Sequence, residues 1–130
     1  MINREEFDKF LNLWAVKDCS TGNEDSVFLF ELARRISPKE ILEIGTFVGK
    51  TAYSLALGGD CIVHTLDSMY HREGHIGQDM FRDFPKYSGN IKRCLMHSTT
   101  YWGTPDVPKF DLIFVDGVIN EFDCDAIFEH

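Results

Sequence analysis

The sequence predicts an α/β fold, with a parallel β-sheet between two layers of helices. Short apolar runs alternate with helical patterns along most of the chain, which is typical of doubly wound parallel sheets. The run from Phe110 to Val115 is nearly unbroken, as expected for a strand that is covered on both faces. A length of 130 residues leaves room for one such domain.

The composition is that of a globular protein and excludes several classes. Hydrophobic residues make up 44% of the chain, which is enough for a core. The net charge of −8, from 21 acidic and 13 basic residues, argues against nucleic acid or a membrane surface as the main partner. Four widely spaced cysteines without a CxxC pair argue against a disulfide framework or a zinc site. The chain has no apolar run of roughly 18 residues and no signal-peptide pattern at its start, so we expect a cytoplasmic protein.

Two helices are predicted before the first strand. The first begins with a capping box in which Asn3 is the cap and Glu6 the third helical residue. Its apolar face has helical spacing and comprises Phe7, Phe10, Leu11 and Trp14. The second helix has Asn23 as its cap and ends before Pro38. Its buried face is expected to comprise Val27, Leu29, Phe30, Leu32, Ala33 and Ile36.

Strands and helices then alternate to the end of the sequence. We expect strands at 41–44, 61–66, 91–96 and 110–115, and helices from Gly49 to Gly58, Ile76 to Phe84 and Glu121 to Phe128. Ligands of such sheets bind beyond the carboxyl ends of the strands. The candidate site residues are therefore those at the strand ends, namely Gly45 to Gly49, Asp67, Ser98 and Asp116.

The glycine-containing segment after the first strand has two interpretations. Gly49, Lys50 and Thr51 look like the end of a phosphate-binding P-loop, but the spacing GxxxGKT is one residue short. A deletion there would alter the cradle of backbone N–H groups that binds phosphate. The other interpretation is an E-x-G-x-x-x-G motif, from Glu43 to Gly49, with an acid at the end of the next strand. Like the P-loop, the dinucleotide-binding pattern GxGxxG does not fit, because this chain has Phe47 and Lys50 where that pattern needs glycines.

Three segments together resemble the class I S-adenosylmethionine-dependent methyltransferases, in particular small-molecule and sugar O-methyltransferases. They are LEIGTFVG at 42–49, HTLD at 64–67 and FDLIFVDG at 110–117, in the family's order. The resemblance implies a three-layer Rossmann-like sheet with strand order 3-2-1-4. It also implies a single domain over 1–130, with an N-terminal helix and connection (1–22), a cofactor-binding core (23–117) and a C-terminal tail (118–130).

The resemblance implies a set of cofactor-binding residues for S-adenosylmethionine. Gly45, Thr46 and Gly49 would form the loop beside the methionine part, and Glu43 would face its ammonium group. Asp67 is similar to the family's acid that binds both ribose hydroxyls. Residues expected around the adenine are Ser68, Met69 and Ser98, although relatives often have an acid at the position of Ser98.

Asp116 is the candidate catalytic residue that the resemblance suggests. It lies at the end of the fourth strand, where it could orient or deprotonate an acceptor. Metal-dependent relatives have an aspartate at this position as a magnesium ligand, so Mg²⁺ is a second candidate cofactor. A solvated acid at the end of a strand is the simpler interpretation of Asp116.

The sequence departs from the family after Gly117. Members of this fold continue through three more strands, whereas 13 residues remain here, and much of the acceptor-binding half has no counterpart. The strand at 110–115 would then be an exposed apolar edge, which favours pairing with another chain. We therefore expect a homo-oligomer formed through this edge, unless the tail from Glu121 to Phe128 covers it.

Three functional hypotheses follow from these observations. The first is an enzyme that methylates a hydroxyl group of a small molecule with S-adenosylmethionine. The second is a module that binds this cofactor without transferring its methyl group, which the short C-terminal part would explain. The third is a nucleotide-binding protein of the P-loop type, in which Lys50 would be essential for phosphate binding.

Overall fold

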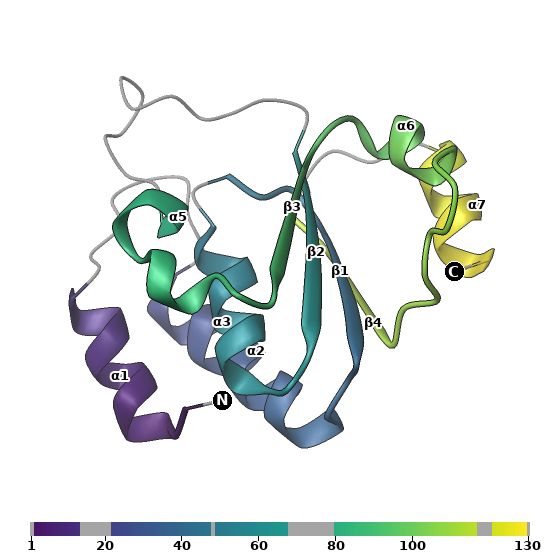
Figure 1. The fold of residues 1–130 in the computed structure, drawn as a ribbon. Helices are drawn as coiled ribbons and strands as arrows, with labels where there is room; N and C mark the ends of the chain where they lie inside the picture. The colour runs from purple at the N-terminus through teal and green to yellow at the C-terminus, as the bar shows by residue number, and fades with distance from the viewer. Residues whose placement is uncertain (1, 14–21, 48, 68–79, 117–120, 130) are drawn as a thin grey trace.

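The protein forms a four-stranded parallel sheet with the strand order β3-β2-β1-β4. The structure is a computed structural model that describes residues 2–13, 22–47, 49–67, 80–116 and 121–129 (Figure 1). The strands are β1 (Glu40–Ile44), β2 (Ile62–Asp67), β3 (Ile91–Leu95) and β4 (Leu112–Val115). The predicted fold class and strand order are therefore confirmed.

Helices cover both faces of this sheet. On one side lie α1 (Arg4–Leu13), α2 (Asn23–Ile36), α3 (Lys50–Gly58) and α5 (Met80–Asp83), the last of which is followed by the 3₁₀-helix η1 (Pro85–Tyr87) (Figure 1). On the other side lie α6 (Ser98–Trp102) and α7 (Glu121–Glu129). The sequence pattern did not predict α6 or η1, because elements of five and three residues are too short to show a periodicity.

The two N-terminal helices begin differently from one another. In α1 the predicted capping box is present, since the Glu6 N–H donates to Asn3 Oδ1 at 2.8 Å and the Asn3 N–H donates to Glu6 Oε2 at 3.3 Å. In α2 the prediction of Asn23 as cap is wrong. Asn23 is already helical, Gly22 occupies the cap position, and Asn23 Oδ1 instead accepts a hydrogen bond from Lys50 Nζ at 2.7 Å.

The largest part of the core lies between the sheet and the helices α1, α2 and α3. Phe7 of α1 stacks on Phe30 of α2 with 4.2 Å between ring centroids, and both rings are fully buried. The helices α2 and α3 are in very close contact at Gly58. A Cβ atom added there would lie 2.2 Å from the Phe30 carbonyl oxygen, so only glycine leaves enough space. Ile36, expected on the buried face of α2, is 45% exposed because it belongs to the last turn of the helix.

The opposite face of the sheet has a smaller core. Leu42, Ile44, Leu66 and Tyr101 are buried there, and Ile127 of α7 packs against them. Trp102 Nε1 donates to Asp123 Oδ1 at 3.1 Å, which attaches α7 to α6. None of the helices in the described ranges is long and apolar enough to cross a bilayer.

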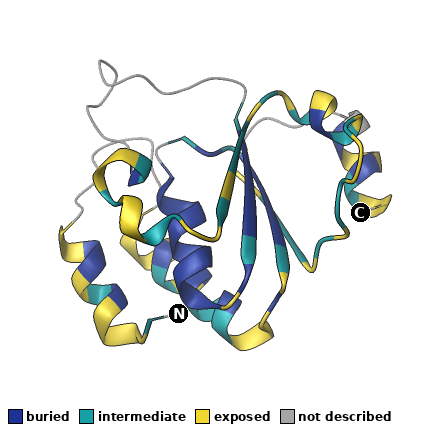
Figure 2. Cartoon of the chain, viewed as in Figure 1, coloured by how far each residue is buried: buried dark blue, intermediate teal, exposed yellow. Residues whose placement is uncertain are grey.

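The last strand is less covered than predicted. The prediction of a strand covered on both faces is wrong for β4, because Leu112, Ile113 and Phe114 are half-buried and Val115 is 37% exposed (Figure 2). The strand also begins at Leu112 rather than Phe110. Asp111 precedes it and accepts hydrogen bonds from the N–H groups of Lys39 and Glu40, which aligns the start of β4 with the start of β1. In the described part of the chain, β4 forms one edge of the sheet.

Candidate functional site

The candidate site is built around the loop that joins β1 to α3. Gly45 (φ 109°), Phe47 (φ 47°) and Gly49 (φ 97°) have left-handed backbone conformations, which turn the chain sharply from the strand into the helix. The N–H groups of Gly45 and Thr46 both donate to the Leu66 carbonyl oxygen, at 2.8 and 3.1 Å. The start of the loop is therefore fixed to the carboxyl end of β2.

Gly49 is required where the loop enters α3. Its left-handed conformation is unfavourable for other residues, and an added Cβ atom would lie 2.7 Å from the Phe81 ring. Phe81 belongs to α5 and also packs edge-on against Tyr53 of α3. The glycine at this position thus allows α5 to pack against the start of α3.

Asp67 is the last residue of β2 and holds the middle of the loop. Its Oδ2 atom accepts a hydrogen bond from the Phe47 N–H at 2.9 Å. The side chain is partly exposed, at the carboxyl end of the strand. An acid at the end of β2 and the glycine-containing loop after β1 are therefore in direct contact, as the candidate cofactor site requires.

Glu43 lies beneath this loop and is fully buried. The Thr65 hydroxyl is 2.5 Å from Glu43 Oε1, to which it donates, and Thr65 Oγ1 is 2.7 Å from Thr46 Oγ1. Glu43 Oε2 has no hydrogen-bond partner among the described residues. The pKa of Glu43 is raised to about 8, mainly by burial; the Thr65 hydrogen bond opposes this increase, and the charges of Asp116 and Asp67 contribute to it.

Asp116 follows β4 and lies on the other side of β1 from Asp67. Its N–H donates to the Ile44 carbonyl oxygen at 2.8 Å, so its backbone is fixed beside the start of the loop. Partial burial and the negative charge of Asp25 raise the pKa of its carboxyl group. The described residues contain no group of three or more His, Cys, Asp or Glu side chains that could hold a metal ion, so nothing supports a Mg²⁺ site at Asp116.

Lys50, the lysine of the P-loop interpretation, is almost completely buried. Its Nζ atom donates to Asn23 Oδ1 and thereby links the first turn of α3 to the first turn of α2. Burial lowers the pKa of Lys50, and the charge of Asp25 opposes this decrease. In this conformation Lys50 joins two helices.

The structure brings together five of the predicted site residues around the loop and the end of β2, namely Glu43, Gly45, Thr46, Gly49 and Asp67. Ser98 is the first residue of α6, which follows β3. Ser68 and Met69 lie outside the described residues. The sequence analysis missed Thr65, although a polar residue in the interior of the apolar run 61–66 is a signal that could have identified it.

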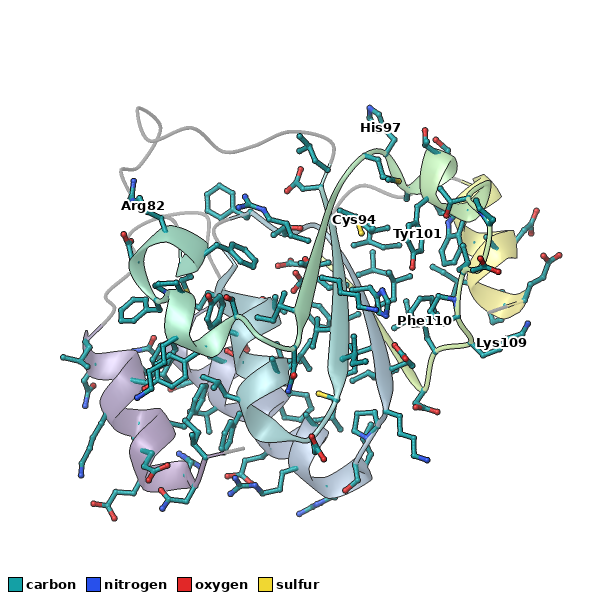
Figure 3. The ribbon with its side chains drawn as sticks, in the orientation of Figure 1. Arg82, Cys94, His97, Tyr101, Lys109 and Phe110 are labelled. Atoms are coloured by element: carbon teal, nitrogen blue, oxygen red, sulfur yellow. The ribbon has the colours of Figure 1, made fainter. Side chains whose placement is uncertain are left out.

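The two faces of the sheet carry different side chains. In Figure 3, Cys94, Tyr101 and Phe110 lie on the side of α6 and α7, whereas Arg82 lies on α5, beyond the opposite face. Burial raises the pKa of Tyr101 to about 12, so its hydroxyl remains protonated at neutral pH. The carboxyl ends of the strands are therefore flanked by two different environments.

Solved structures of methyltransferases share this fold. A SAH-bound methyltransferase of Podospora anserina is 20% identical, with a TM-score of 0.68 over 99% of this chain and 65% of its own. An O-methyltransferase of Bacillus cereus in complex with SAH is 21% identical, with a TM-score of 0.64 over 87% of this chain and 53% of its own. The C-terminal domain of precorrin-6Y C5,15-methyltransferase of Rhodobacter capsulatus is 17% identical, with a TM-score of 0.66 over 91% of this chain and 61% of its own.

These similarities establish the fold of the chain. Its parallel sheet of order 3-2-1-4 with flanking helices is the Rossmann-like fold of the class I methyltransferases. The chain spans between about half and two thirds of the length of the three solved structures. No protein-family model and no curated protein matches the sequence.

Proposed function

Starting from the methyltransferase fold, we propose that this protein is an S-adenosylmethionine-dependent methyltransferase that acts on a hydroxyl group of a small molecule. One observation carries the proposal. The glycine-containing loop after β1 is hydrogen-bonded to the acid at the end of β2, through the Phe47 N–H and Asp67 Oδ2 at 2.9 Å. A cofactor laid across the carboxyl ends of β1 and β2 would meet both elements at once.

The residues at this place fit the cofactor's chemistry. Asp67 is partly exposed, and its carboxyl oxygens are suited to accept hydrogen bonds from the two ribose hydroxyls. The acids Asp67 and Asp116 lie on either side of the loop, which favours a cationic ligand over a phosphate. The Oε2 atom of Glu43, which has no hydrogen-bond partner in the described part of the chain, is a further polar atom beneath the loop. Ser68, Met69 and Ser98 are proposed as adenine contacts on the resemblance alone.

The proposed catalytic contribution of the chain is positioning and proton transfer. S-adenosylmethionine, when bound, supplies an activated methyl group on a positively charged sulfur. Asp116 lies beside the start of the loop and would orient an acceptor hydroxyl or accept its proton. The raised pKa of Asp116 makes its carboxylate a somewhat stronger base than an ordinary aspartate.

A module that binds the cofactor without transferring its methyl group is the second candidate function. Cofactor binding alone requires only the loop after β1 and the acid at the end of β2, which are in contact through Phe47 and Asp67. The P-loop interpretation has less support, because Lys50 is buried and bonded to Asn23. In a P-loop the lysine reaches the β- and γ-phosphates.

The domain organisation that we propose is a single unit over residues 1–130, with 23–117 as the cofactor-binding core. The support comes from α1, whose Phe7, Phe10 and Leu11 share one buried cluster with Phe30 of α2 and Tyr53 of α3. Removing α1 would expose this cluster. The N-terminal segment is therefore proposed as a structural part of the same domain.

We also propose that the chain forms a homo-oligomer through β4. This strand is an edge of the described sheet and is only partly covered, with Val115 37% exposed. Size-exclusion chromatography with light scattering is expected to show a dimer or larger species. A Val115→Lys substitution is expected to shift that species towards the monomer, whereas a monomer at every concentration would contradict the proposal.

The test of the proposed function is a pair of calorimetric titrations of the purified protein. S-adenosylmethionine is expected to bind with a micromolar Kd, and ATP with magnesium is expected not to bind. Binding of ATP alone would reverse the assignment in favour of the P-loop interpretation. Once cofactor binding is established, a screen of small-molecule alcohols and phenols with methyl-labelled cofactor separates the enzyme from the binding module.

A further inference from the structure

A polar row crosses the sheet directly beneath the candidate site. Glu43 of β1 is in register with Thr65 of β2, and Thr65 is in register with Arg93 of β3. Glu43 and Thr65 are both fully buried, and Thr46 of the loop is 2% exposed. Buried polar side chains are costly unless their hydrogen bonds are satisfied, so such a row calls for a specific role.

We propose that Thr65 is a positioning residue of the cofactor site, which joins the loop to Glu43 and couples the ionisation of Glu43 to the binding of a cationic cofactor. This inference rests on the proposed function. It concerns a residue that lies below the loop and acts through two neighbours.

The hydrogen-bond directions follow from the number of protons. The Thr65 hydroxyl has one proton, which it donates to Glu43 Oε1 at 2.5 Å. The contact of 2.7 Å between Thr65 Oγ1 and Thr46 Oγ1 is therefore donated by Thr46. The result is a chain of hydrogen bonds that runs from the loop through Thr65 to the buried carboxyl group. A change in the ionisation of Glu43 is therefore expected to affect the hydrogen bond to the loop, and a change in the loop is expected to affect Glu43.

Only one of the two carboxyl oxygens of Glu43 has a hydrogen-bond partner among the described residues. Its Oε2 atom is buried without a hydrogen-bond partner in the described part of the chain. Burial raises the pKa of Glu43 to about 8, so most of this group is protonated at neutral pH. A positive charge that arrives above the loop stabilises the carboxylate, and the proton of Glu43 then leaves to the solvent. The Thr65 hydrogen bond favours the same ionised form.

Among the residues that the structure describes, the charged groups around Glu43 do not supply that positive charge. Asp67 on β2 and Asp116 after β4 are acidic and oppose its ionisation. Lys50 on α3 bonds to Asn23 of α2, and the negative charge of Asp25, also on α2, acts on it. Arg93 on β3 is separated from Glu43 by Thr65 and places its guanidinium 4.4 Å from the centroid of the Phe81 ring. The cofactor's sulfonium and ammonium groups would provide the missing charge.

The experiment compares the wild-type protein with Thr65→Val and Thr65→Ser. Valine keeps the shape of threonine and removes the hydroxyl, whereas serine retains it. Each protein is titrated between pH 6 and 9 with S-adenosylmethionine and with 5′-methylthioadenosine, which lacks the sulfonium and the amino-acid part. Buffers of different ionisation enthalpy give the number of protons released. The amino group of the ligand titrates in the same way for every variant, so differences among the variants report on the protein.

In the wild type we expect the Kd of S-adenosylmethionine to decrease as the pH rises towards about 8, with release of a proton. In Thr65→Val we expect binding about tenfold weaker at pH 7, from the loss of a hydrogen bond to a charged group. The pH range over which affinity increases should also shift upward. Thr65→Ser should restore the wild-type profile. Binding of 5′-methylthioadenosine should be the same in all three proteins.

Two results would overturn the inference while leaving the proposed function intact. One is wild-type affinity and proton release in Thr65→Val. The other is an equal loss of both ligands, which would show a purely structural role. Failure of the wild type to bind S-adenosylmethionine would contradict the proposed function itself. If Thr65→Val does not fold, Glu43→Gln takes its place. This variant should abolish the proton release from the protein that accompanies cofactor binding. Unchanged proton release in Glu43→Gln would overturn the inference.

Discussion

The region from β1 to α3 and the region from β4 to α7 differ in how completely they are packed. Every residue of α3 is buried, as are four of the five residues of β1 (Figure 2). In β4 three residues are half-buried and the last is exposed, and Phe128 of α7 is 91% exposed. The region from β1 to α3 is therefore closely packed, whereas the region from β4 to α7 exposes apolar side chains.

The difference corresponds to the two tasks of the proposed enzyme. The packed region holds the loop whose geometry depends on Gly45, Gly49 and the bond to Asp67. A site that must hold one cofactor in one orientation benefits from such rigidity. Under the proposed function, we expect the open region to bind an acceptor or a second subunit. The following predictions test this contrast, from the largest expected effect to the smallest.

Gly58→Ala should have the largest effect on stability. A methyl group there would lie 2.2 Å from the Phe30 carbonyl oxygen, so α2 and α3 would have to separate. Overpacking of this kind costs about 3 kcal/mol or prevents folding. Urea unfolding measures the loss. The matched control is Gly89→Ala, where an added methyl group meets no atom within 4 Å and should change the free energy of unfolding little.

Glu43→Gln should change how stability depends on pH. The pKa of Glu43 is raised from about 4.5 to about 8, so the neutral form is favoured in the folded state and stability is lost as the pH rises through this range. The wild type should lose on the order of a few kcal/mol between these pH values relative to Glu43→Gln.

The measurement is urea unfolding from pH 4 to 9, with Glu5→Gln as the control because the side chain of Glu5 is 80% exposed. The control should follow the wild-type curve. Parallel curves for the wild type and Glu43→Gln would show that Glu43 has the same pKa in the folded and unfolded states and would contradict the burial argument.

Trp102→Phe should loosen the open region without affecting the packed one. It removes the hydrogen bond from Trp102 Nε1 to Asp123, whose side chain is 1% exposed and would lose that donor. A loss of about 1 kcal/mol is expected. Hydrogen exchange should increase in α7 and remain unchanged in α3. An equal increase in both helices would show that the two regions unfold as one unit.

The sequence was sufficient to predict the parts of the fold that have a strong pattern. The alternation of apolar runs predicted the strands of the described sheet, because buried parallel strands have distinctive compositions, and the resemblance to class I methyltransferases implied their order. It did not predict that Asn23 would bond to Lys50, because that contact depends on how α2 and α3 pack. The exposure of β4 depends on which elements flank it, and a local pattern does not contain that information.

The candidate site was predictable to the extent that it lies at strand ends. Glu43, the loop glycines and Asp67 were identified from their spacing, and the structure places them in contact through Phe47 and Thr65. Thr65 itself was missed because a threonine in a strand is ordinary. Its role depends on the register of β1 and β2, which pairs it with Glu43.

The most direct test of the account is a titration of S-adenosylmethionine into the wild type, Asp67→Ala and Asp60→Ala. Asp60 is an exposed acid before β2 and serves as the control. We predict micromolar binding to the wild type and to Asp60→Ala. We predict at least a tenfold loss in Asp67→Ala, since this substitution removes the proposed ribose acceptor and the bond to Phe47. Equal binding to all three proteins would contradict the assignment of the cofactor site to the ends of β1 and β2.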